Sequence, residues 1–511
     1  MNQRKMGVIL SYLSAGLATV ISLLYTPLML RLLGQSEYGV YNTALAFISY
    51  LSLMQFGLNS AFARFYARYQ TRGDVMGIKR LNGLYMMFYL VISLLSVLAG
   101  SVLVRYAHVF LGAKLTAAEL AKTRVLMRIL IVNTALMFPI TLFSSNITVN
   151  ERYIFARLMT ILKQVASPLV AIPLLLMGYD SVGIVIATTI ITVVIGTCEL
   201  IYCIKKLHMG ICFRRVEKGL LKEILVFTSY IFIGTMVTQI NWSLGRIVLA
   251  GTVGAVAVAI YSVGEQLNQY YISMSTTVSD VFAPKVYRMA SRGASDRDFT
   301  ELFTRVGRIQ FLIMALISTG FIILGRDFIG KWAGEEYYHS DAYLCAVLLF
   351  VANIVHGTQY LGITILQAKN LHKFRSLFYL GMCAVNIAIS IPLSKAFGPL
   401  GIAIATFLIV ILGTGVVMNI YYYKKAKLDI PFFWRQIISM CKGLIIPAIA
   451  GALIMLFCDT SGWMRMILFG GIYVVIYCVS VWFLSMNDYE RGLIKRPANK
   501  VLRKLHLPQI P

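Results

Sequence analysis

Two ionisable side chains stand well inside apolar stretches of the sequence. Arg246 lies about one helical turn from the end of the stretch 224–250, and Glu265 lies near the middle of the stretch 255–282. A charge inside a membrane-spanning segment indicates a functional site, because it is costly to bury there. Arginine binds phosphate and carboxylate groups through paired hydrogen bonds. The structural alternative is a salt bridge between Arg246 and Glu265, and both interpretations stay open.

Polar and aromatic residues accompany these two charges at helical spacing. In the first stretch three candidates are Gln239, Trp242 and, beside them, Asn241; in the second they are Tyr261 and Asn268. Polar side chains of this kind either line a polar site or join transmembrane helices through hydrogen bonds. For each of these residues, a role in a polar site and a role in joining helices both stay open.

Three further arginines stand at or near the ends of apolar stretches. Arg64 and Arg68 are four residues apart, so they share a helix face at the end of the stretch 39–62. Gln55 and Asn59 extend this face, so a polar stripe is expected to lead away from the two arginines. Arg128 lies one turn inside the stretch 125–149. Ordinary flanking charge is the alternative for the arginine pair, and snorkelling to the interface is the alternative for Arg128.

The elements that position these residues are predicted to be transmembrane helices. Of the 511 residues 59% are hydrophobic and only 13% are charged, and the mean hydropathy is +0.76. A soluble domain contains about a quarter charged residues, so a water-soluble globular protein is excluded. Fourteen stretches are long and apolar enough to span a bilayer. They are 7–30, 39–62, 81–104, 125–149, 155–177, 182–204, 224–250, 255–282, 308–325, 342–366, 375–394, 399–423, 438–457 and 466–486.

Most of the basic residues fall on one side of these spans. The net charge of +26, from 47 Lys+Arg and 21 Asp+Glu, first suggests a nucleic-acid partner. With the N-terminus inside, however, 36 of the 47 fall on cytoplasmic segments and only nine on outer loops. This is the positive-inside pattern. It predicts a multi-pass protein of the cytoplasmic membrane with both termini in the cytoplasm, and it removes the reason for a nucleic-acid partner.

The sequence contains an internal repeat. The residues from Gly183 to Thr188 match those from Gly401 to Thr406, and Gly34 and Tyr41 match Gly254 and Tyr261 at an offset of 220. The fold class is therefore an all-α membrane protein of two six-helix lobes, as parallel repeats, plus two C-terminal helices. The predicted boundaries are 1–210, 211–428 and 429–511, the last including a basic cytoplasmic tail. Duplicated lobes are typical of transporters that work by alternating access.

Motifs for catalysis or cofactor binding are absent from the sequence. The eight cysteines form no CxxC pair, and there is no GxxxxGK[ST] phosphate loop. We therefore predict no catalytic residue, no metal ligand and no cofactor, and the protein is not expected to be an enzyme. A membrane polysaccharide polymerase is the alternative from the enzyme class, but it would leave the repeat without a purpose.

The turn between the first two spans carries a recognisable motif. It reads Leu-Gly-x-x-x-Tyr-Gly-x-Tyr from Leu33 to Tyr41 and follows the run from Thr26 to Leu32; Gly254 to Tyr261 repeats its Gly-x6-Tyr spacing. With fourteen spans in two lobes, it resembles the polysaccharide or O-antigen-type flippases. These belong to the multidrug/oligosaccharidyl-lipid/polysaccharide exporter superfamily.

This resemblance implies a function, a substrate and partners. It implies export of an undecaprenyl-pyrophosphate-linked oligosaccharide across a bacterial cytoplasmic membrane, among membrane lipids and with a polymerase and glycosyltransferases as further partners. Such a substrate needs cations for phosphate, which Arg64, Arg68 and Arg246 offer, and polar or aromatic groups for sugars. Relatives carry an acidic residue in the seventh span and a basic residue in the eighth. With Arg246 in the stretch 224–250 and Glu265 in the stretch 255–282, this chain shows the opposite order of charges.

Two alternatives within the superfamily remain. A multidrug/cation antiporter needs carboxylates inside the membrane, but the first span has no charge from Met6 to Leu30 and only Glu265 is clearly at mid-membrane. A lipid II flippase would be expected to carry basic residues midway along spans 1 and 8, and these are absent. A capsule, O-antigen or teichoic-type sugar is therefore preferred.

Overall fold

The computed structural model describes residues 3–55, 57–111, 114–213, 218–493, 495 and 499, and this part of the chain is helical without any strand. Eleven of its segments are long and apolar enough to cross a membrane. The prediction of an all-α multi-pass membrane protein is therefore confirmed. Large apolar side chains remain exposed on these helices, for example Phe457 at 80% and Met464 at 83%, as expected where lipid replaces water.

The eleven segments correspond closely to the fourteen predicted spans. The first segment, Leu13–Thr71, covers most of the predicted span 7–30 and all of 39–62. The seventh and eighth predicted spans, 224–250 and 255–282, correspond to α7 (Lys218–Thr252) and α8 (Ala255–Ser291). These two helices are long enough to span a bilayer but are not among the eleven segments. These two helices carry most of the polar candidate residues.

One of the predicted spans is broken. Helix α1 (Gln3–Ser49) is followed by the short 3₁₀ segment η1 (Leu51–Gln55), and α2 begins only at Leu58. Gly57, which precedes α2, has a φ of 69°, a left-handed conformation that glycine adopts without strain. The prediction of one continuous helix over 39–62 is therefore wrong.

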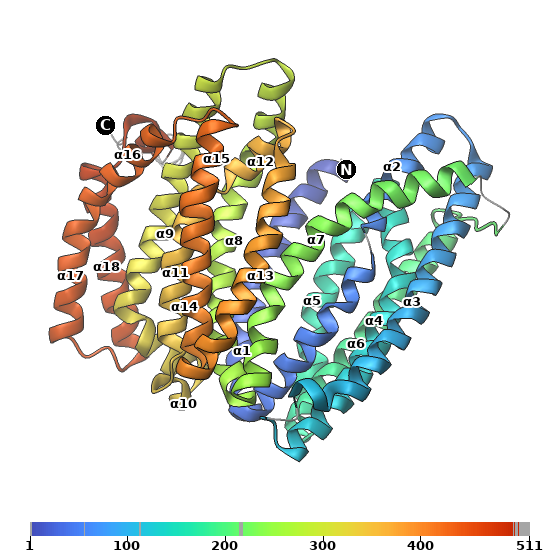
Figure 1. Ribbon diagram of the computed structural model, residues 1–511, viewed down its shortest axis with the longest axis horizontal. Helices are drawn as coiled ribbons and strands as arrows, with labels where there is room; N and C mark the ends of the chain where they lie inside the picture. The colour runs from blue at the N-terminus through green and yellow to red at the C-terminus, as the bar shows by residue number, and fades with distance from the viewer. Residues whose placement is uncertain are drawn as a thin grey trace. The chain divides into compact units, whose positions relative to one another are not determined.

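The chain forms two compact units, each described here by itself. Unit 1 contains residues 1–262 and 387–402. Its further helices are α3 (Val75–Leu111), α4 (Ala117–Val149), α5 (Tyr153–Leu176), α6 (Asp180–Lys205) and α7. Helix α4 is central, since it packs against α1, α3 and α6, and α3, α4 and α6 run side by side in Figure 1.

The loops of unit 1 gather at two ends. At one end Tyr66 donates a hydrogen bond to Asn150, and Asn82 donates one to the Gly210 carbonyl, so the α2–α3, α4–α5 and α6–α7 connections meet there. The basic residues of these connections make this the basic end of unit 1; they are Arg72, Lys79, Arg80, Arg152, Lys205 and Lys206. The turn at Gly34 lies at the opposite end.

Unit 2 contains residues 263–386 and 403–511. The elements that follow α8 in the chain are α9 (Asp296–Ala333), α10 (Glu335–Tyr338), α11 (Ala342–Thr358), α12 (Leu361–Ala368), α13 (His372–Phe397), α14 (Pro399–Val410), the π-helical η2 (Ile411–Met418), α15 (Asn419–Lys424), α16 (Ile430–Met440), η3 (Cys441–Leu444), α17 (Ile445–Phe457) and α18 (Trp463–Leu484). All belong to unit 2 except residues 387–402, at the end of α13 and the start of α14. Helix α9 packs against α11, α16, α17 and α18, and α17 and α18 lie side by side in Figure 1.

The backbone repeats as the sequence does. Glycines with positive φ recur at an offset of 220: Gly34 (71°) with Gly254 (127°), Gly73 (67°) with Gly293 (66°), and Gly178 (84°) with Gly398 (57°). Each marks the turn between two helices, where a left-handed residue is needed. Three turns of the first lobe thus have counterparts in the second. The two repeats are confirmed, while the lobe boundaries 1–210, 211–428 and 429–511 stay a proposal.

The two glycine positions of the Leu-Gly-x-x-x-Tyr-Gly-x-Tyr motif require glycine for different reasons. Gly34 kinks α1 with its positive φ. Gly39 has no room for a side chain, because a Cβ there would lie 1.9 Å from the carbonyl oxygen of Ala255 at the start of α8. The motif therefore brings the second half of α1 into backbone contact with α8 within unit 1.

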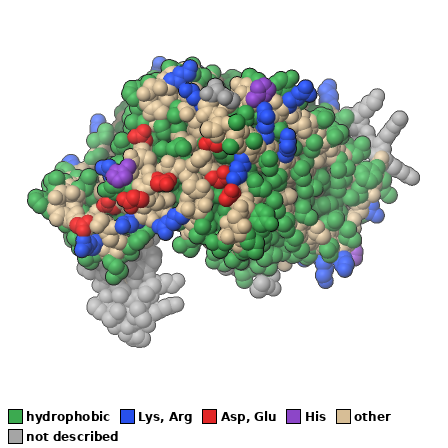
Figure 2. All heavy atoms as spheres, turned by 90° about the horizontal axis from the view of Figure 1, so that it is seen from below, with side chains coloured by type: hydrophobic (Ala, Val, Ile, Leu, Met, Phe, Trp, Pro, Cys, Tyr) green, Lys and Arg blue, Asp and Glu red, His purple; other side chains and the backbone are tan. Residues whose placement is uncertain are grey.

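The surface fits a membrane protein. Figure 2, which views the end of Figure 1 where α10 lies, shows acidic and basic side chains gathered on this face and hydrophobic side chains beside them. Glu335 and Glu336 of α10 are two acidic residues of this end in unit 2. Charged groups thus collect where the helices end, as water requires, and apolar groups cover their flanks.

Candidate functional site

Arg64 and Arg68 share one face of α2 and both contact an acidic residue of α7. Arg68 Nη1 lies 3.1 Å from Glu223 Oε2, and Arg64 Nη2 lies 3.8 Å from Glu223 Oε1. All three side chains are about half exposed, so the pairs are screened by water and contribute little stability. The arrangement holds two guanidinium groups side by side over one carboxylate.

The polar stripe expected beyond these arginines is interrupted. Gln55 belongs to η1 and Asn59 to α2, so the break at Gly57 removes the i,i+4 relation between them. Gln55 is half-buried and Asn59 is exposed. Asn59 accepts a hydrogen bond of 2.6 Å from the Tyr89 hydroxyl, so its amide is oriented by α3.

A polar cluster joins α1 to α7 within unit 1. Gln239 Nε2 donates to Ser49 Oγ at 2.8 Å and to Ser243 Oγ at 2.7 Å, and the two serine hydroxyls lie 2.8 Å apart. The two serines were not predicted to belong to the site. Serine is common in such helices, so its presence in the sequence does not mark either residue as a partner of Gln239. The neighbouring side chains of Asn241 and Trp242 lie outside the described residues.

Arg246 lies further along α7, half-buried and within electrostatic range of Tyr41. Next to it, Gly245 allows the buried ring of Tyr261 to pack closely, since a Cβ at Gly245 would lie 3.0 Å from Tyr261 Cε1. Glu265 is buried, with 3% exposure, and belongs to unit 2. A salt bridge between Arg246 and Glu265 therefore stays a prediction.

Asn268 is part of the interior of unit 2. Its Oδ1 accepts a hydrogen bond of 3.1 Å from Asn353 Nδ2, and both residues are buried. Asn353 also donates to the Leu349 carbonyl of its own helix. These bonds tie α8 to α11.

Arg128 of α4 is exposed, one turn after the half-buried Arg124. Closer to the start of the same helix, Lys122 Nζ lies 2.9 Å from Glu37 Oε2 and 2.8 Å from Asp180 Oδ2. This bridge fastens the Gly34 turn of α1 to α4 and α6. The end of unit 1 opposite the basic end is thus closed by paired charges.

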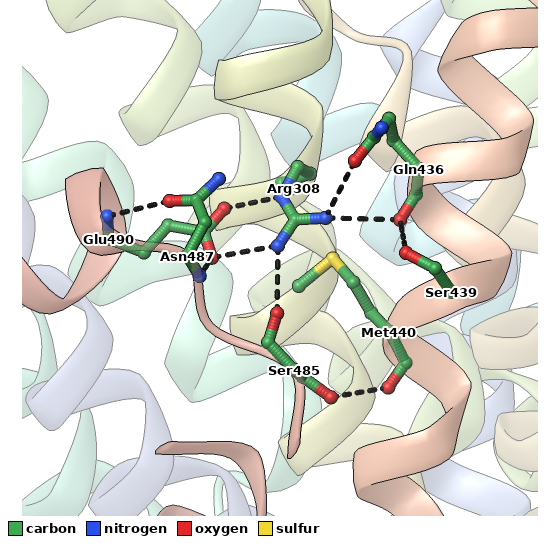
Figure 3. A network of polar contacts seen from close by, with 7 residues as sticks. All are labelled: Arg308, Gln436, Ser439, Met440, Ser485, Asn487 and Glu490. Carbon is green, nitrogen blue, oxygen red and sulfur yellow. Dashed lines mark hydrogen bonds and ion pairs between the residues drawn. The ribbon is translucent and has the colours of Figure 1, made fainter. Parts of the chain in front are cut away.

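The most fully bonded ion pair of the described residues was not predicted at all. Arg308 of α9 and Glu490 are 6% and 2% exposed, and they form two hydrogen bonds, of 2.5 and 3.0 Å. The guanidinium also donates to Gln436 and to the Ser485 carbonyl, while the Glu490 carboxylate accepts from the Asn487 amide (Figure 3). The network fastens the C-terminal helices to α9, so it is structural.

The sequence pattern of a known family matches more than half of the chain. The family is described as polysaccharide biosynthesis protein, and the match covers residues 5–284. The chain belongs to this family. The resemblance noted from the Gly34–Tyr41 motif is thereby confirmed. Comparison with curated proteins finds none that matches.

Solved structures share the fold of this polysaccharide biosynthesis protein. The lipid II flippase MurJ, in an inward closed conformation, matches with a TM-score of 0.72 and 15% identity over 96% of this chain and 99% of that one. An inward-facing multidrug resistance MATE family transporter of the MOP superfamily matches with a TM-score of 0.64 and 12% identity, over 82% and 95%. A MOP superfamily transporter from Pyrococcus furiosus gives 0.53 and 15%, over 83% and 96%. At these identities the similarity establishes the transporter fold.

Proposed function

We propose that the protein is a flippase that moves an undecaprenyl-pyrophosphate-linked oligosaccharide from the cytoplasmic to the outer leaflet, for cell-surface polysaccharide biosynthesis. One observation carries the proposal: a chain of the polysaccharide biosynthesis family has the fold of a lipid flippase over 96% of its length. The protein is accordingly proposed to be a transporter and not an enzyme.

The basic end of unit 1 is proposed to be cytoplasmic, with both chain termini on that side. It carries the excess of lysine and arginine that cytoplasmic segments carry. A lipid-linked sugar is assembled from cytoplasmic precursors, so glycosyltransferases would supply the substrate at this end. A polymerase at the other face would consume it.

Arg64 and Arg68 are proposed to capture the pyrophosphate at the inner leaflet. They are adjacent, about half exposed and both in contact with Glu223, so an entering anion can reach them. A guanidinium binds phosphate oxygens bidentately, and a pyrophosphate carries more negative charge than one carboxylate. The substrate would therefore displace Glu223 from the arginines, and the carboxylate would take them back after release.

The polar residues of α7 and α8 are proposed to receive the sugars. Gln239 already bridges Ser49 and Ser243, so sugar hydroxyls can replace serine hydroxyls as partners at little cost. The other proposed contacts along the path are Gln55, Asn59, Arg128, Asn241, Trp242, Arg246, Tyr261, Glu265 and Asn268. Rocking of one repeat against the other would then expose the site alternately to the two sides.

Depletion of the protein in its host cell tests this function against a multidrug/cation antiporter. A flippase is expected to leave lipid-linked oligosaccharide accumulating in the inner leaflet and to abolish the surface polysaccharide, with no change in sensitivity to cationic drugs. Unchanged surface polysaccharide together with increased drug sensitivity would contradict the proposal and favour the antiporter.

A further inference from the structure

A cavity with a basic lining lies at one end of unit 2. Its volume is about 410 Å³, and it lies where α8 and α12 end, α9 begins and α15 turns toward α16. Three lysines from two different turns line it together with one aspartate, so the lining carries a net charge of +2. The lining residues are Ala290, Ala294, Asp296, Phe299, Ala368, Lys369, Leu371, Lys425, Ala426 and Lys427.

One of the lysines is fixed in place. Lys369 Nζ lies 2.6 Å from Asp296 Oδ1, donates a hydrogen bond of 2.8 Å to the Ala426 carbonyl, and stands 4.6 Å from the centre of the Phe299 ring. Phe299 itself is buried, with 2% exposure. The Asp296 carboxylate is thus already engaged, and the back of the cavity is a rigid wall of an aromatic ring and alanine methyl groups.

The other two lysines are exposed. Lys425 and Lys427 lie on the turn after α15, and no salt bridge engages either of them among the described residues. Lys427 has a φ of 55°, so the chain reverses there and both side chains stay at the cavity. The bond from Lys369, which follows α12, to the Ala426 carbonyl joins this turn to the turn after α15. This bond does not account for an open cavity beside two further cations.

The position of the cavity decides which anion it suits. It stands at the ends of three segments long and apolar enough to cross a membrane, Asp296–Ala333, Ala342–Ala368 and Pro399–Lys424, where a bilayer would present its headgroups. Basic pockets between membrane helices suit anionic lipid headgroups, and each lysine near the surface contributes an attraction of about 1 kcal/mol. Small alanines leave room beside the lysines for the glycerol that follows a phosphate.

We propose that this cavity binds the phosphate of an anionic phospholipid headgroup. Lys425 and Lys427 hold the phosphate, Lys369 supports it from the wall, and the acyl chains remain in the surrounding bilayer. The site is separate from Arg64 and Arg68, which belong to unit 1, and it does not depend on the proposed flippase function.

The test compares phospholipid binding by the full-length protein and by the variant K425Q/K427Q. Purified protein in neutral detergent is titrated with phosphatidylglycerol, with phosphatidylcholine and with inorganic pyrophosphate, and binding is followed by native mass spectrometry and by the shift in melting temperature. The variant K205Q/K206Q is the matched control, since it also removes two exposed lysines at the C-terminal end of a helix, here α6.

We expect phosphatidylglycerol to bind and to raise the melting temperature of the wild type and of K205Q/K206Q. In K425Q/K427Q the affinity should fall about tenfold or more, as expected for the loss of two lysine attractions, while the melting temperature without lipid is unchanged. Phosphatidylcholine should have no effect. Equal binding of phosphatidylglycerol by K425Q/K427Q would overturn the proposal. An equal stabilisation by inorganic pyrophosphate would also overturn it, because the site would then recognise a soluble anion.

Discussion

Arg68 Nη1 of α2 lies 3.1 Å from Glu223 Oε2 of α7, so the proposed phosphate-binding arginines hold a carboxylate of their own chain. The same carboxylate lies 3.8 Å from Arg64. A carboxylate in this position can act as a substitute for the substrate phosphate: it offsets the repulsion between the two guanidinium groups, and it competes with an entering anion.

The variant E223Q should therefore bind the lipid pyrophosphate more tightly. The glutamine keeps the shape of the side chain and removes the competing charge, whereas the unfolding free energy should change by less than about 1 kcal/mol, because the pair is half exposed. Titration with undecaprenyl pyrophosphate measures the first effect and thermal unfolding the second. Weaker binding by E223Q would show that Glu223 does not compete with substrate.

Unlike the half-exposed pair at Glu223, the buried pair of Arg308 and Glu490 should have a large effect on stability when one partner is removed. R308M leaves the Glu490 carboxylate buried with one backbone donor, so the protein should lose about 3–5 kcal/mol of stability. The double variant R308M/E490M removes both charges and should recover much of this loss. Thermal unfolding followed by helical circular dichroism compares the two. A double variant as unstable as the single one would contradict this view of the network.

Most of the fold could be predicted from the sequence because lipid imposes a simple rule. A span of about 20 apolar residues must be a helix, and the repeat at an offset of 220 reappears in the structure at Gly34 and Gly254. The break at Gly57 could not be predicted, since a single glycine inside an apolar stretch is compatible with a continuous helix. The pairing of Arg308 with Glu490 could not be predicted either, because the two residues are 182 positions apart in the sequence.

The candidate site could be predicted less fully. The shared face of Arg64 and Arg68 follows from their spacing, but their contact with Glu223 depends on how α2 and α7 pack. The same holds for Ser49 and Ser243, which become partners of Gln239 only through helix packing. Spacing along one helix is visible in a sequence, and contacts between distant helices are not.

Gly39 should tolerate no side chain. A Cβ there would lie 1.9 Å from the Ala255 carbonyl oxygen, so G39A should force α1 and α8 apart and cost about 1–3 kcal/mol. Gly16 is the matched control, since a Cβ there meets nothing within 4 Å, and G16A should be neutral or slightly stabilising. Melting temperatures of the two variants provide the comparison. Equal melting temperatures would show that the close approach is not required.

Single cysteines should reveal which side each end of unit 1 faces. In a variant without the eight native cysteines, R72C at the basic end should react with an impermeant thiol reagent only from the cytoplasm, and Y179C, at an exposed position of the α5–α6 connection, only from outside. Labelling of intact cells and of inverted vesicles measures this. The reverse pattern would contradict the proposed orientation.

The most direct test of the central proposal is the transbilayer movement of a labelled undecaprenyl-pyrophosphate oligosaccharide in vesicles that contain the purified protein. The wild type and the control K205Q/K206Q should move the lipid at the same rate, whereas R64Q/R68Q should move it about tenfold more slowly or worse, because two charge-assisted phosphate contacts are lost. R246Q provides a second test of phosphate binding. If the wild type gives no movement above protein-free vesicles, the protein is not the proposed flippase; if R64Q/R68Q and R246Q both transport like the wild type, the assignment of phosphate to these arginines is wrong.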